Sequence, residues 1–456
     1  MKKRGFYFNT ENNTYFYNDI TGNVSHDLNK KSNSVSYGNE SYINKTVTEY
    51  DVKNILDNIG CTQLILIVTE QCNLRCKYCV YSGEYDNNRT HSNNYMQLDT
   101  AKDVVRKYLE NVTLHRKNDI STTATIGFFG GEPLLNFDLI QSIVEYSKLI
   151  FKGTINYTIT TNATLLNADK IKFLVENNFS LIISLNGDLC ENDRLRVYHN
   201  NSGTYDDIIE KLNMISNKYP SYFNTNVKVI STFDNGTDLF KLRDFFENNS
   251  LVKNKLAFAS KIIDFHTNWY DQYSIIDNER YKLQVNELKK SFYNNLLNNN
   301  YIDTLSKKLF MLPYFNVLNR ATNIELTNYK STLQPFSGSC IPGSKIAVDY
   351  TGTLHMCEKV NNKTPIGTVE KWLDHTKISS LLNKYNKFLG KTCINCPVQR
   401  LCSICYKDII NIDGNCDFNH DTWCNTFIKD QIASFTDIYT LMESGITVST
   451  LEKRLT

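Results

Sequence analysis

The sequence predicts an α/β fold built on a parallel sheet, followed by a cysteine-rich domain. Between residue 62 and about residue 260, apolar segments of strand length alternate six times with amphipathic segments of helical length. Such alternation predicts parallel strands joined by right-handed crossovers. Six units are fewer than the eight that close a (β/α)8 barrel, so we expect a partial barrel. From residue 338 onward, eight cysteines fall within 85 residues.

The elements follow in order along the chain. A preface contains a hairpin, Phe6–Phe8 and Tyr15–Tyr17, and a helix from Val47 to Ile59. The expected strands are 62–68, 124–129, 155–160, 180–186, 226–232 and 256–260, and the helices are 98–117, 136–151, 167–177, 205–217 and 237–248. Residues 279–322 are expected to form helices. We expect a preface at 1–58, the barrel at 59–265, a helical connector at 266–337, the cysteine-rich domain at 338–430 and a helical tail at 431–456.

Composition narrows the class of protein. A net charge of +2 gives no field that would favour nucleic acid or membrane. No apolar run approaches the roughly 20 residues that span a bilayer, and the basic Met1–Arg4 precedes a segment too polar for a signal peptide. Thirteen cysteines, an odd number, favour metal binding over disulfides. We therefore expect a cytoplasmic protein with no nucleic-acid or membrane partner.

Three cysteines directly after the first strand are the most informative feature. Cys72, Cys76 and Cys79 have the spacing C-x3-C-x2-C and follow the apolar run Leu64–Val68. A [4Fe–4S] cluster is normally held by four thiolates, so three leave one iron open. A zinc site with a distant fourth ligand and unrelated buried thiols are the alternatives. The pattern, with Tyr78 as the aromatic before the third cysteine, resembles the radical S-adenosylmethionine (SAM) superfamily. The resemblance implies that SAM chelates the open iron and is split into methionine and a 5′-deoxyadenosyl radical.

A second motif follows the second strand. Gly130-Gly131-Glu132-Pro133 resembles the family's GGEP motif, which holds the methionyl amino group of SAM. Glycines permit close approach of the backbone to a ligand, and a carboxylate accepts hydrogen bonds from an ammonium group. The alternative is an ordinary strand-to-helix turn.

A third motif follows the third strand. Thr160–Leu166 resembles the family's TNGTLL run, so the resemblance places Thr161 and Asn162 beside the ribose and carboxylate of SAM. Ala163 replaces the usual glycine. We therefore expect a turn that avoids a positive φ at this residue.

The fourth strand is followed by two further motifs. Ser184-Leu-Asn186-Gly187 resembles S-x-D-G, and Asp193-Arg194-Leu-Arg196 resembles the end of H-D-x-x-R. By resemblance, Ser184 contacts the ribose or carboxylate, and Arg196 pairs with the SAM carboxylate. Asn186 stands where the family has Asp, and Asn192 where it has His, which puts substrate contacts there in doubt. Arg194 is equally explained as a surface ion-pair partner.

The C-terminal cysteines resemble the SPASM domain, which binds two auxiliary [4Fe–4S] clusters. The similarity rests on a cysteine followed by G-x4-C and then C-x2-C-x5-C, with one residue fewer than usual before the next cysteine. By resemblance, Cys340, Cys357 and Cys405 hold the first auxiliary cluster. Cys393, Cys396, Cys402 and either Cys416 or Cys424 hold the second. Two zinc ions are the alternative.

The first auxiliary set lacks one cysteine. Many SPASM enzymes have a further cysteine about six residues after the first, but Ile341–Ile346 contains none. There are two possibilities for the fourth iron of this cluster. It is open, or it is bound by whichever of Cys416 and Cys424 the second cluster does not use. Cys61 and Cys190 are expected to be ordinary thiols.

Together, the motifs resemble SPASM-type peptide maturases that form thioethers, the sactipeptide and ranthipeptide enzymes. The resemblance implies SAM and three [4Fe–4S] clusters as cofactors, with a leader-bearing precursor peptide and a reductant such as flavodoxin or ferredoxin as partners. Glu358, next to Cys357, is the candidate base, with a pKa expected to be raised; a surface carboxylate paired with Lys359 is the alternative. Three other reactions are alternatives: sulfatase-type formylglycine formation, carbon–carbon crosslinking and epimerisation. A non-catalytic iron–sulfur or zinc protein is the alternative from a different class. The preface is expected to bind the leader by strand addition or to cap the barrel.

Overall fold

The computed structural model describes most of the chain. The described residues are 5–26, 46–83, 85, 89–115, 123–262, 267–320, 340–393, 396–411, 413–416 and 420–455. The last two residues of the expected helix 98–117 and the last two of the segment 279–322 lie outside them. None of the helices in these ranges is both long and apolar enough to cross a bilayer.

Six parallel strands form the centre of the molecule, as predicted. They are β4 (Gln63–Thr69), β5 (Thr123–Gly130), β6 (Thr154–Thr161), β7 (Ser180–Ser184), β8 (Val227–Phe233) and β9 (Leu256–Lys261). Each pairs in parallel with the next along the chain. β4 is buried from Leu64 to Thr69, because a parallel sheet is covered on both faces.

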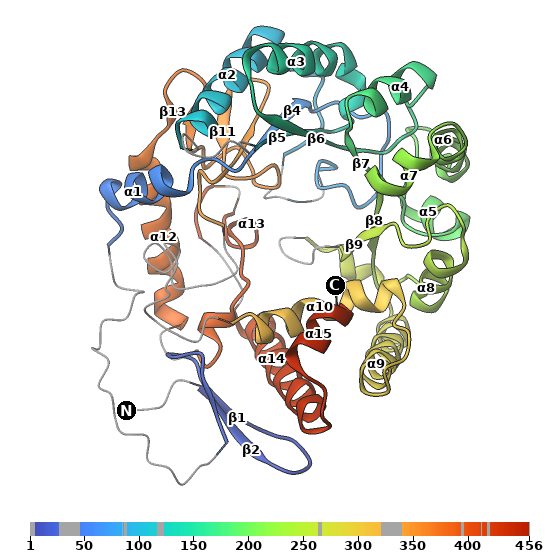
Figure 1. Ribbon diagram of the computed structural model, residues 1–456, viewed down its shortest axis with the longest axis vertical. Helices are drawn as coiled ribbons and strands as arrows, with labels where there is room; N and C mark the ends of the chain where they lie inside the picture. The colour runs from blue at the N-terminus through green and yellow to red at the C-terminus, as the bar shows by residue number, and fades with distance from the viewer. Residues whose placement is uncertain are drawn as a thin grey trace.

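Helices cover the outside of this curved sheet (Figure 1). They are α2 (Leu98–His115), α3 (Phe137–Ile150), α4 (Ala168–Glu176), α5 (Leu189–Leu195), α6 (Tyr205–Lys218), α7 (Pro220–Asn226) and α8 (Leu239–Asn248). The short α5 and α7 were not predicted. α5 begins because the Asp188 side chain accepts a hydrogen bond from Glu191 N, and it ends at Arg196. It therefore sets the position of the arginine motif.

The sheet continues into the cysteine-rich half of the chain. β10 (Lys345–Val348) pairs in parallel with β4, from Lys345↔Gln63 to Val348↔Leu66. β11 (Thr353–His355), β12 (Gly367–Thr368) and β13 (Trp372–Leu373) follow as antiparallel strands. The ten strands from β4 to β13 thus form one sheet, in the order β13-β12-β11-β10-β4-β5-β6-β7-β8-β9. Strands this short carry too weak a pattern to be predicted from the sequence.

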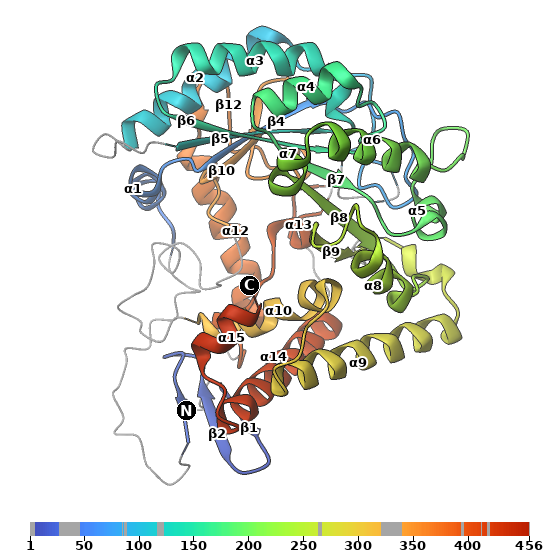
Figure 2. The same cartoon turned by 45° about the vertical axis from the view of Figure 1, so that its right-hand side comes forward.

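The remaining α-helices and β-strands lie outside the six-stranded barrel; in Figure 2 most of them are below it, and α1 (Glu49–Ile59) is beside it. They are α9 (Ile275–Leu297), α10 (Thr304–Leu318), α12 (His375–Cys393), α13 (Tyr406–Ile409), α14 (His420–Glu443), α15 (Val448–Leu455), β1 (Gly5–Asn9), β2 (Thr14–Asn18), β3 (Val24–Ser25) and α1 (Glu49–Ile59). The predicted hairpin is present as β1 and β2. It packs on α14, with Tyr17 and Phe435 rings 4.7 Å apart, rather than over the barrel. α1 packs against α12.

A buried ionic network joins the barrel to the added strands. Nη1 of Arg89 lies 3.8 Å from Oε1 of Glu70, just after β4, and 3.5 Å from Oδ2 of Asp349, just after β10. The same Asp349 oxygen is 2.8 Å from Nε2 of His355. Burial lowers the pKa of His355 below its usual 6.5, against an opposing effect of Asp349. Burial alone would raise the pKa of Asp349, but its hydrogen bonds with His355 and Thr351 lower it to about 2.

This network predicts loss of stability on acidification. Because the folded pKa of His355 lies below 6.5, the unfolded chain takes up the proton first, and folding free energy is lost as the pH falls below 6.5. A second loss follows as the pH falls from 3.8 toward 2, where unfolded but not folded Asp349 is protonated. His355→Gln should flatten the first loss, measured as urea midpoints at about pH 7.5 and about pH 5.5. His375→Gln, an imidazole outside the network, is the control. An equal pH slope in wild type and His355→Gln contradicts this assignment.

Candidate cofactor and metal-cluster sites

The loop that carries Cys72, Cys76 and Cys79 is fixed to the barrel from two sides. On one side, backbone N of Arg75 donates to Val197 O at 2.8 Å, and backbone N of Lys77 donates to Leu195 O at 2.9 Å. These bonds join the loop to the end of α5. On the other side, the loop meets the turn after β5, described below. The loop is therefore held in place by the chain itself.

The sulfur atoms lie in surroundings that suit a bound cation. Backbone N–H groups of Leu74 and Tyr81 donate to the sulfurs of Cys72 and Cys79, each at 3.4 Å. Burial raises the pKa of Cys72 to about 12 and that of Cys79 to about 11, and neighbouring acidic groups add to this. Thiols with such values stay protonated near neutral pH unless a metal ion stabilises the thiolate.

The two glycines of the GGEP motif allow the turn after β5 to pack closely against the beginning of this loop. A Cβ on Gly130, whose φ is +151°, would lie 2.2 Å from Thr69 O, and a Cβ on Gly131 would lie 2.3 Å from Gln71 O. Instead, Gly131 N donates to Thr69 O at 2.9 Å. The glycines thus let the end of β5 pack directly on the segment that leads into Cys72.

Glu132 is fully buried and nearly saturated with hydrogen bonds. Its Oε1 accepts from Leu134 N at 3.0 Å and from Thr161 Oγ1 at 2.6 Å, and its Oε2 accepts from Asn162 N at 2.8 Å. A carboxylate has about four acceptor sites, so one remains on Oε2. Burial raises the pKa of Glu132, against these hydrogen bonds. A buried carboxylate without an ion pair, and with one acceptor site left, fits an ammonium group of a ligand.

The turn after β6 corrects one expectation. Ala163 has a φ of +66°, although we expected its side chain to exclude a positive φ. The turn is fixed at both ends, because Ala163 N donates to Thr161 Oγ1 and Leu166 N donates to Ala163 O, each at 3.0 Å. The left-handed conformation costs an alanine about 1–2 kcal/mol, which these bonds and complete burial offset. Asn162 in this turn also donates to Asn73 Oδ1 at 2.9 Å, which joins the turn to the cysteine loop.

Two buried donors beside Tyr78 have no hydrogen-bond partner among the described residues. Nη1 of Arg196 donates to the Tyr78 hydroxyl at 2.7 Å, and this hydroxyl donates to Oδ1 of Asn186 at 3.3 Å. Nε of Arg196 and Nδ2 of Asn186 are the unpaired donors. A buried polar group without a partner is costly, so these donors fit an anionic or polar ligand group. Cys72 and Cys76 are close enough to Arg196 for their charges to raise its pKa, against burial.

Three other residues predicted from the motifs after β7 differ in burial and in their contacts. Ser184 is half-buried at the end of β7. Asn192 is fully buried and donates to Thr204 Oγ1 at 3.1 Å, so it serves the fold. Arg194 forms ion pairs with Glu191 at 2.7 Å and with the fully buried Asp234 at 2.8 Å, so it is an ion-pair partner as expected, but not at the surface.

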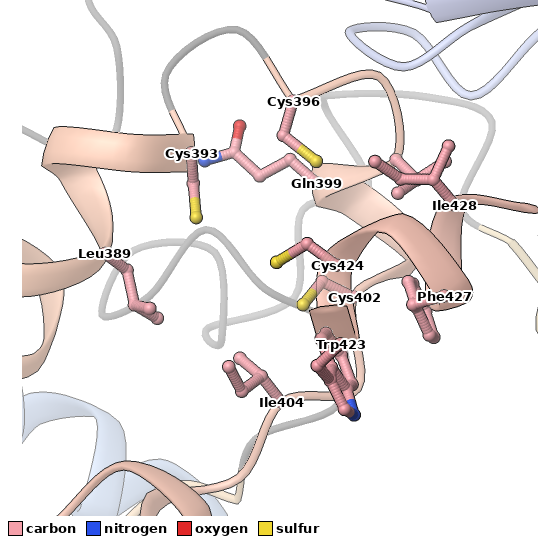
Figure 3. A pocket seen from close by; sticks show the side chains of 11 residues that line it. Leu389, Cys393, Cys396, Gln399, Cys402, Ile404, Trp423, Cys424, Phe427 and Ile428 are labelled. Carbon is pink, nitrogen blue, oxygen red and sulfur yellow. The ribbon is translucent and has the colours of Figure 1, made fainter. Parts of the chain in front are cut away.

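Four cysteines line one pocket between α12 and α14. Figure 3 shows the sulfurs of Cys393, Cys396, Cys402 and Cys424 pointing toward a common space, with Leu389, Ile404, Trp423 and Phe427 among the apolar residues around it. Cys416 does not line this pocket; it pairs with Ile410 in a short bridge. Of the two alternatives left open by the sequence, the geometry therefore brings Cys424 to the second auxiliary set.

The residues proposed for the first auxiliary set have neighbours in common. Cys340 is close enough to Cys405 and to Lys345 to influence the pKa of each, and Cys357 also raises the pKa of Lys345. Backbone N of Lys359 donates to the Cys357 sulfur at 3.4 Å, like the N–H groups at Cys72 and Cys79. Cys61 is buried and Cys190 exposed, as expected of thiols outside these sets.

Glu358 has a different environment from the one expected. It forms an ion pair with Lys345 Nζ at 2.8 Å, not with Lys359, and only 9% of its side chain is exposed. Burial favours the neutral acid, but the Lys345 charge and hydrogen bond outweigh it and lower the pKa of Glu358. The expected raised pKa is therefore wrong. Lys345 was missed by the sequence reasoning, although it lies next to the position where many SPASM enzymes have the missing cysteine.

Comparisons with known proteins identify the class of one part of the chain. Residues 66–236 match the Radical SAM superfamily, so this part of the chain is a radical SAM domain. A cysteine-type anaerobic sulfatase-maturating enzyme of Clostridium novyi is 30% identical over 191 residues, 40% of this chain and 49% of that protein. An uncharacterized protein of Methanocaldococcus jannaschii is 38% identical over 210 residues, 45% of this chain and 62% of that protein. The chain thus spans only part of the length of these relatives.

Two further likenesses extend over most of the chain. The radical SAM cyclopropyl synthase TigE of Paramaledivibacter caminithermalis is 23% identical over 376 residues, 77% of this chain and 71% of that protein. The structure of native anSMEcpe with bound AdoMet has a TM-score of 0.61 at 18% identity and covers 84% of this chain and 99% of that one. This likeness shows a shared fold that includes both halves of the chain.

The unpaired donors generate a prediction for SAM binding. Arg196→Ala removes a charged donor, and such a hydrogen bond is worth about 1.5–3 kcal/mol, so SAM affinity should fall by about tenfold to a hundredfold. Anaerobic equilibrium binding of SAM to the iron-reconstituted protein measures this. Arg194→Gln, on the same helix but paired with Asp234, should bind SAM as wild type does. Unchanged affinity in Arg196→Ala shows that the carboxylate contact lies elsewhere.

Proposed function

We propose that this protein uses SAM and three [4Fe–4S] clusters to form a thioether in a cysteine-containing precursor peptide. One observation carries the proposal: the cysteine loop lies beside a buried set of unsatisfied polar groups complementary to the methionyl end of SAM. These are the free acceptor site of Glu132 and the unpaired donors of Arg196 and Asn186. A reductant such as flavodoxin or ferredoxin supplies the electron.

Different protein groups bind the ammonium group and the carboxylate group of the methionyl part of SAM. Glu132 accepts from the ammonium group, whose positive charge adds to that of the nearby Arg196 in stabilising the buried carboxylate. Arg196 and Asn186 donate to the carboxylate, with Ser184 nearby at the end of β7. When bound at the Cys72–Cys79 loop, SAM and the cluster supply a 5′-deoxyadenosyl radical that abstracts hydrogen.

The spacing of the auxiliary cysteines favours clusters over zinc. A single zinc ion draws its thiolates to about 2.3 Å from the metal. Among the described residues, no three His, Cys, Asp or Glu side chains are grouped closely enough to hold one ion. A [4Fe–4S] cluster binds each thiolate at a separate iron, so it accepts the wider pocket of Cys393, Cys396, Cys402 and Cys424.

Glu358 is the candidate proton acceptor. Joining carbon to sulfur removes a hydrogen atom from carbon and a proton from the thiol, and one electron must leave. The Lys345 ion pair keeps Glu358 ionised near neutral pH, so its carboxylate can take the thiol proton. Its position directly after Cys357 places this base beside the first auxiliary set.

The N-terminal sheet is the candidate site for a leader peptide. β1 stands at one end of the strand order β1-β2-β3. An edge strand offers backbone groups to which an extended peptide can add.

Formylglycine formation is a second candidate, favoured by the similarity to cysteine-type anaerobic sulfatase-maturating enzymes, one of which is 24% identical over 74% of this chain. The two products differ in composition. A thioether peptide has lost two hydrogen atoms and keeps its sulfur, whereas a formylglycine peptide has lost sulfur and gained oxygen. Mass spectrometry of cysteine-containing peptides incubated with protein, SAM and reductant separates them.

The cluster content has its own test. Anaerobic reconstitution should give about twelve irons per chain, with about four lost in the Cys72→Ala, Cys76→Ala, Cys79→Ala triple variant. Reduced wild type should yield 5′-deoxyadenosine and methionine, and the triple variant none. Stoichiometric zinc with about four irons contradicts two auxiliary clusters. Absence of SAM cleavage in the iron-loaded protein favours a non-catalytic iron–sulfur protein.

Glu358→Gln tests the proton acceptor. This variant should keep its iron and still cleave SAM, but lose most peptide product, because the amide cannot accept the thiol proton. Product yield by mass spectrometry is measured in parallel with iron content. Glu370→Gln, an exposed glutamate in the β12–β13 turn, is the matched control. Full product formation by Glu358→Gln shows that thiol activation does not need this carboxylate.

A further inference from the structure

The N-terminal hairpin is bonded directly to the loop that carries two cysteines of the second auxiliary set. Arg400 lies in this loop, between Cys396 and Cys402. Its backbone N donates to Oδ1 of Asp19 at 3.0 Å, and its Nε donates to the backbone O of Asp19 at 3.0 Å. Its Nη2 donates to Ile20 O. Segments almost 400 positions apart in the sequence therefore meet at one residue pair.

Apolar packing supports the same contact. Val398 and Leu401 of the cysteine loop belong to one buried core with residues of β1, β2 and α14. The loop's other side faces the pocket, because Cys396, Gln399 and Cys402 line it (Figure 3). The loop is thus a thin layer between the hairpin and the four cysteines.

Asp19 brings a carboxylate into this layer. The residue has no solvent exposure, and the Tyr17 hydroxyl donates to its Oδ1 at 3.2 Å. Its Oδ1 also accepts from Arg400 N at 3.0 Å, so the carboxylate lies one hydrogen bond from the loop of Cys396 and Cys402. The Arg400 guanidinium instead bonds outward, to backbone oxygens of the hairpin, where its Ile20 contact is exposed. Solvent screens that charge more than it screens the carboxylate.

We infer that Asp19 is a positioning residue for the second auxiliary cluster: it fixes the Cys396–Cys402 loop and lowers the reduction potential of the cluster by its buried negative charge. Reduction adds one electron to the cluster. A fixed negative charge nearby opposes this, and the effect is large where solvent is excluded. The N-terminal hairpin then acts on the redox chemistry of a site at the other end of the chain. The inference rests on the proposed presence of a cluster in this pocket.

The test separates charge from structure. Asp19→Asn keeps an oxygen that accepts from Arg400 N but removes the charge. Glu443→Gln is the control: this half-buried carboxylate accepts from Thr10, Asn13 and Tyr15 at the other end of the hairpin, about 13 Å along β2 from Asp19. The full-length, anaerobically reconstituted protein is titrated electrochemically and followed by EPR. The signal of the second auxiliary cluster is identified by its loss in Cys402→Ala.

At a fixed potential, Asp19→Asn should raise the reduced-to-oxidised ratio of this cluster by about tenfold, about 59 mV for one electron. Glu443→Gln should leave it unchanged. An unchanged potential in iron-loaded Asp19→Asn, or an equal shift in both variants, overturns the inference. If the Asp19→Asn variant loses iron, the Asp19→Ser variant is measured in its place. If both Asp19 variants lose iron while Glu443→Gln keeps it, the role of Asp19 is purely structural. If Cys402→Ala removes neither iron nor signal, the proposed second cluster itself is wrong.

Discussion

The parallel pairing of β10 with β4 is the interaction on which the arrangement of the whole protein depends. β4 leads into Cys72, and the hairpin of β10 and β11 leads into Cys357. Because the two strands share hydrogen bonds in fixed register, the radical SAM loop and the first auxiliary set have fixed relative positions. The buried network around Arg89 and Asp349 reinforces this join with charge. Its hydrogen bonds offset part of the cost of burying these groups, but Nη2 of Arg89 and Nδ1 of His355 have no partner among the described residues.

The unpaired hydrogen-bonding groups beside the cysteine loop indicate which ligand groups they could bind. Most buried polar groups in a folded protein are paired, so an unpaired group beside the cysteine loop is a candidate ligand contact, although unpaired groups also occur elsewhere in the described residues. Here the exceptions have complementary signs: a spare acceptor site on Glu132, and spare donors on Arg196 and Asn186. Asn186 departs from the family's aspartate, and the departure is chemically consistent. An amide offers a donor beside Arg196, where a carboxylate would offer none.

Lys345 determines the charge state of Glu358. It lies at the beginning of β10 and forms an ion pair with Glu358. A cation at this point lowers the pKa of the neighbouring acid, whereas burial alone would raise it. Glu358 is therefore ionised near neutral pH, but its lowered pKa also makes it a weaker base.

The sequence by itself determined the parallel sheet, the order of its six strands and the position of each motif at a strand end, because periodicity and spacing are local properties. It also indicated which cysteines are candidate ligands, because thiolates are the usual ligands of iron–sulfur clusters. Tertiary structure alone decided which side chains meet: Cys424 rather than Cys416 in the four-cysteine pocket, Lys345 beside Glu358, and Asp19 beside the loop of Cys396. The positive φ of Ala163 also came from its surroundings, because hydrogen bonds at both ends of the turn outweigh the preference of the residue. Such choices depend on contacts between residues far apart in sequence, and no local pattern records them.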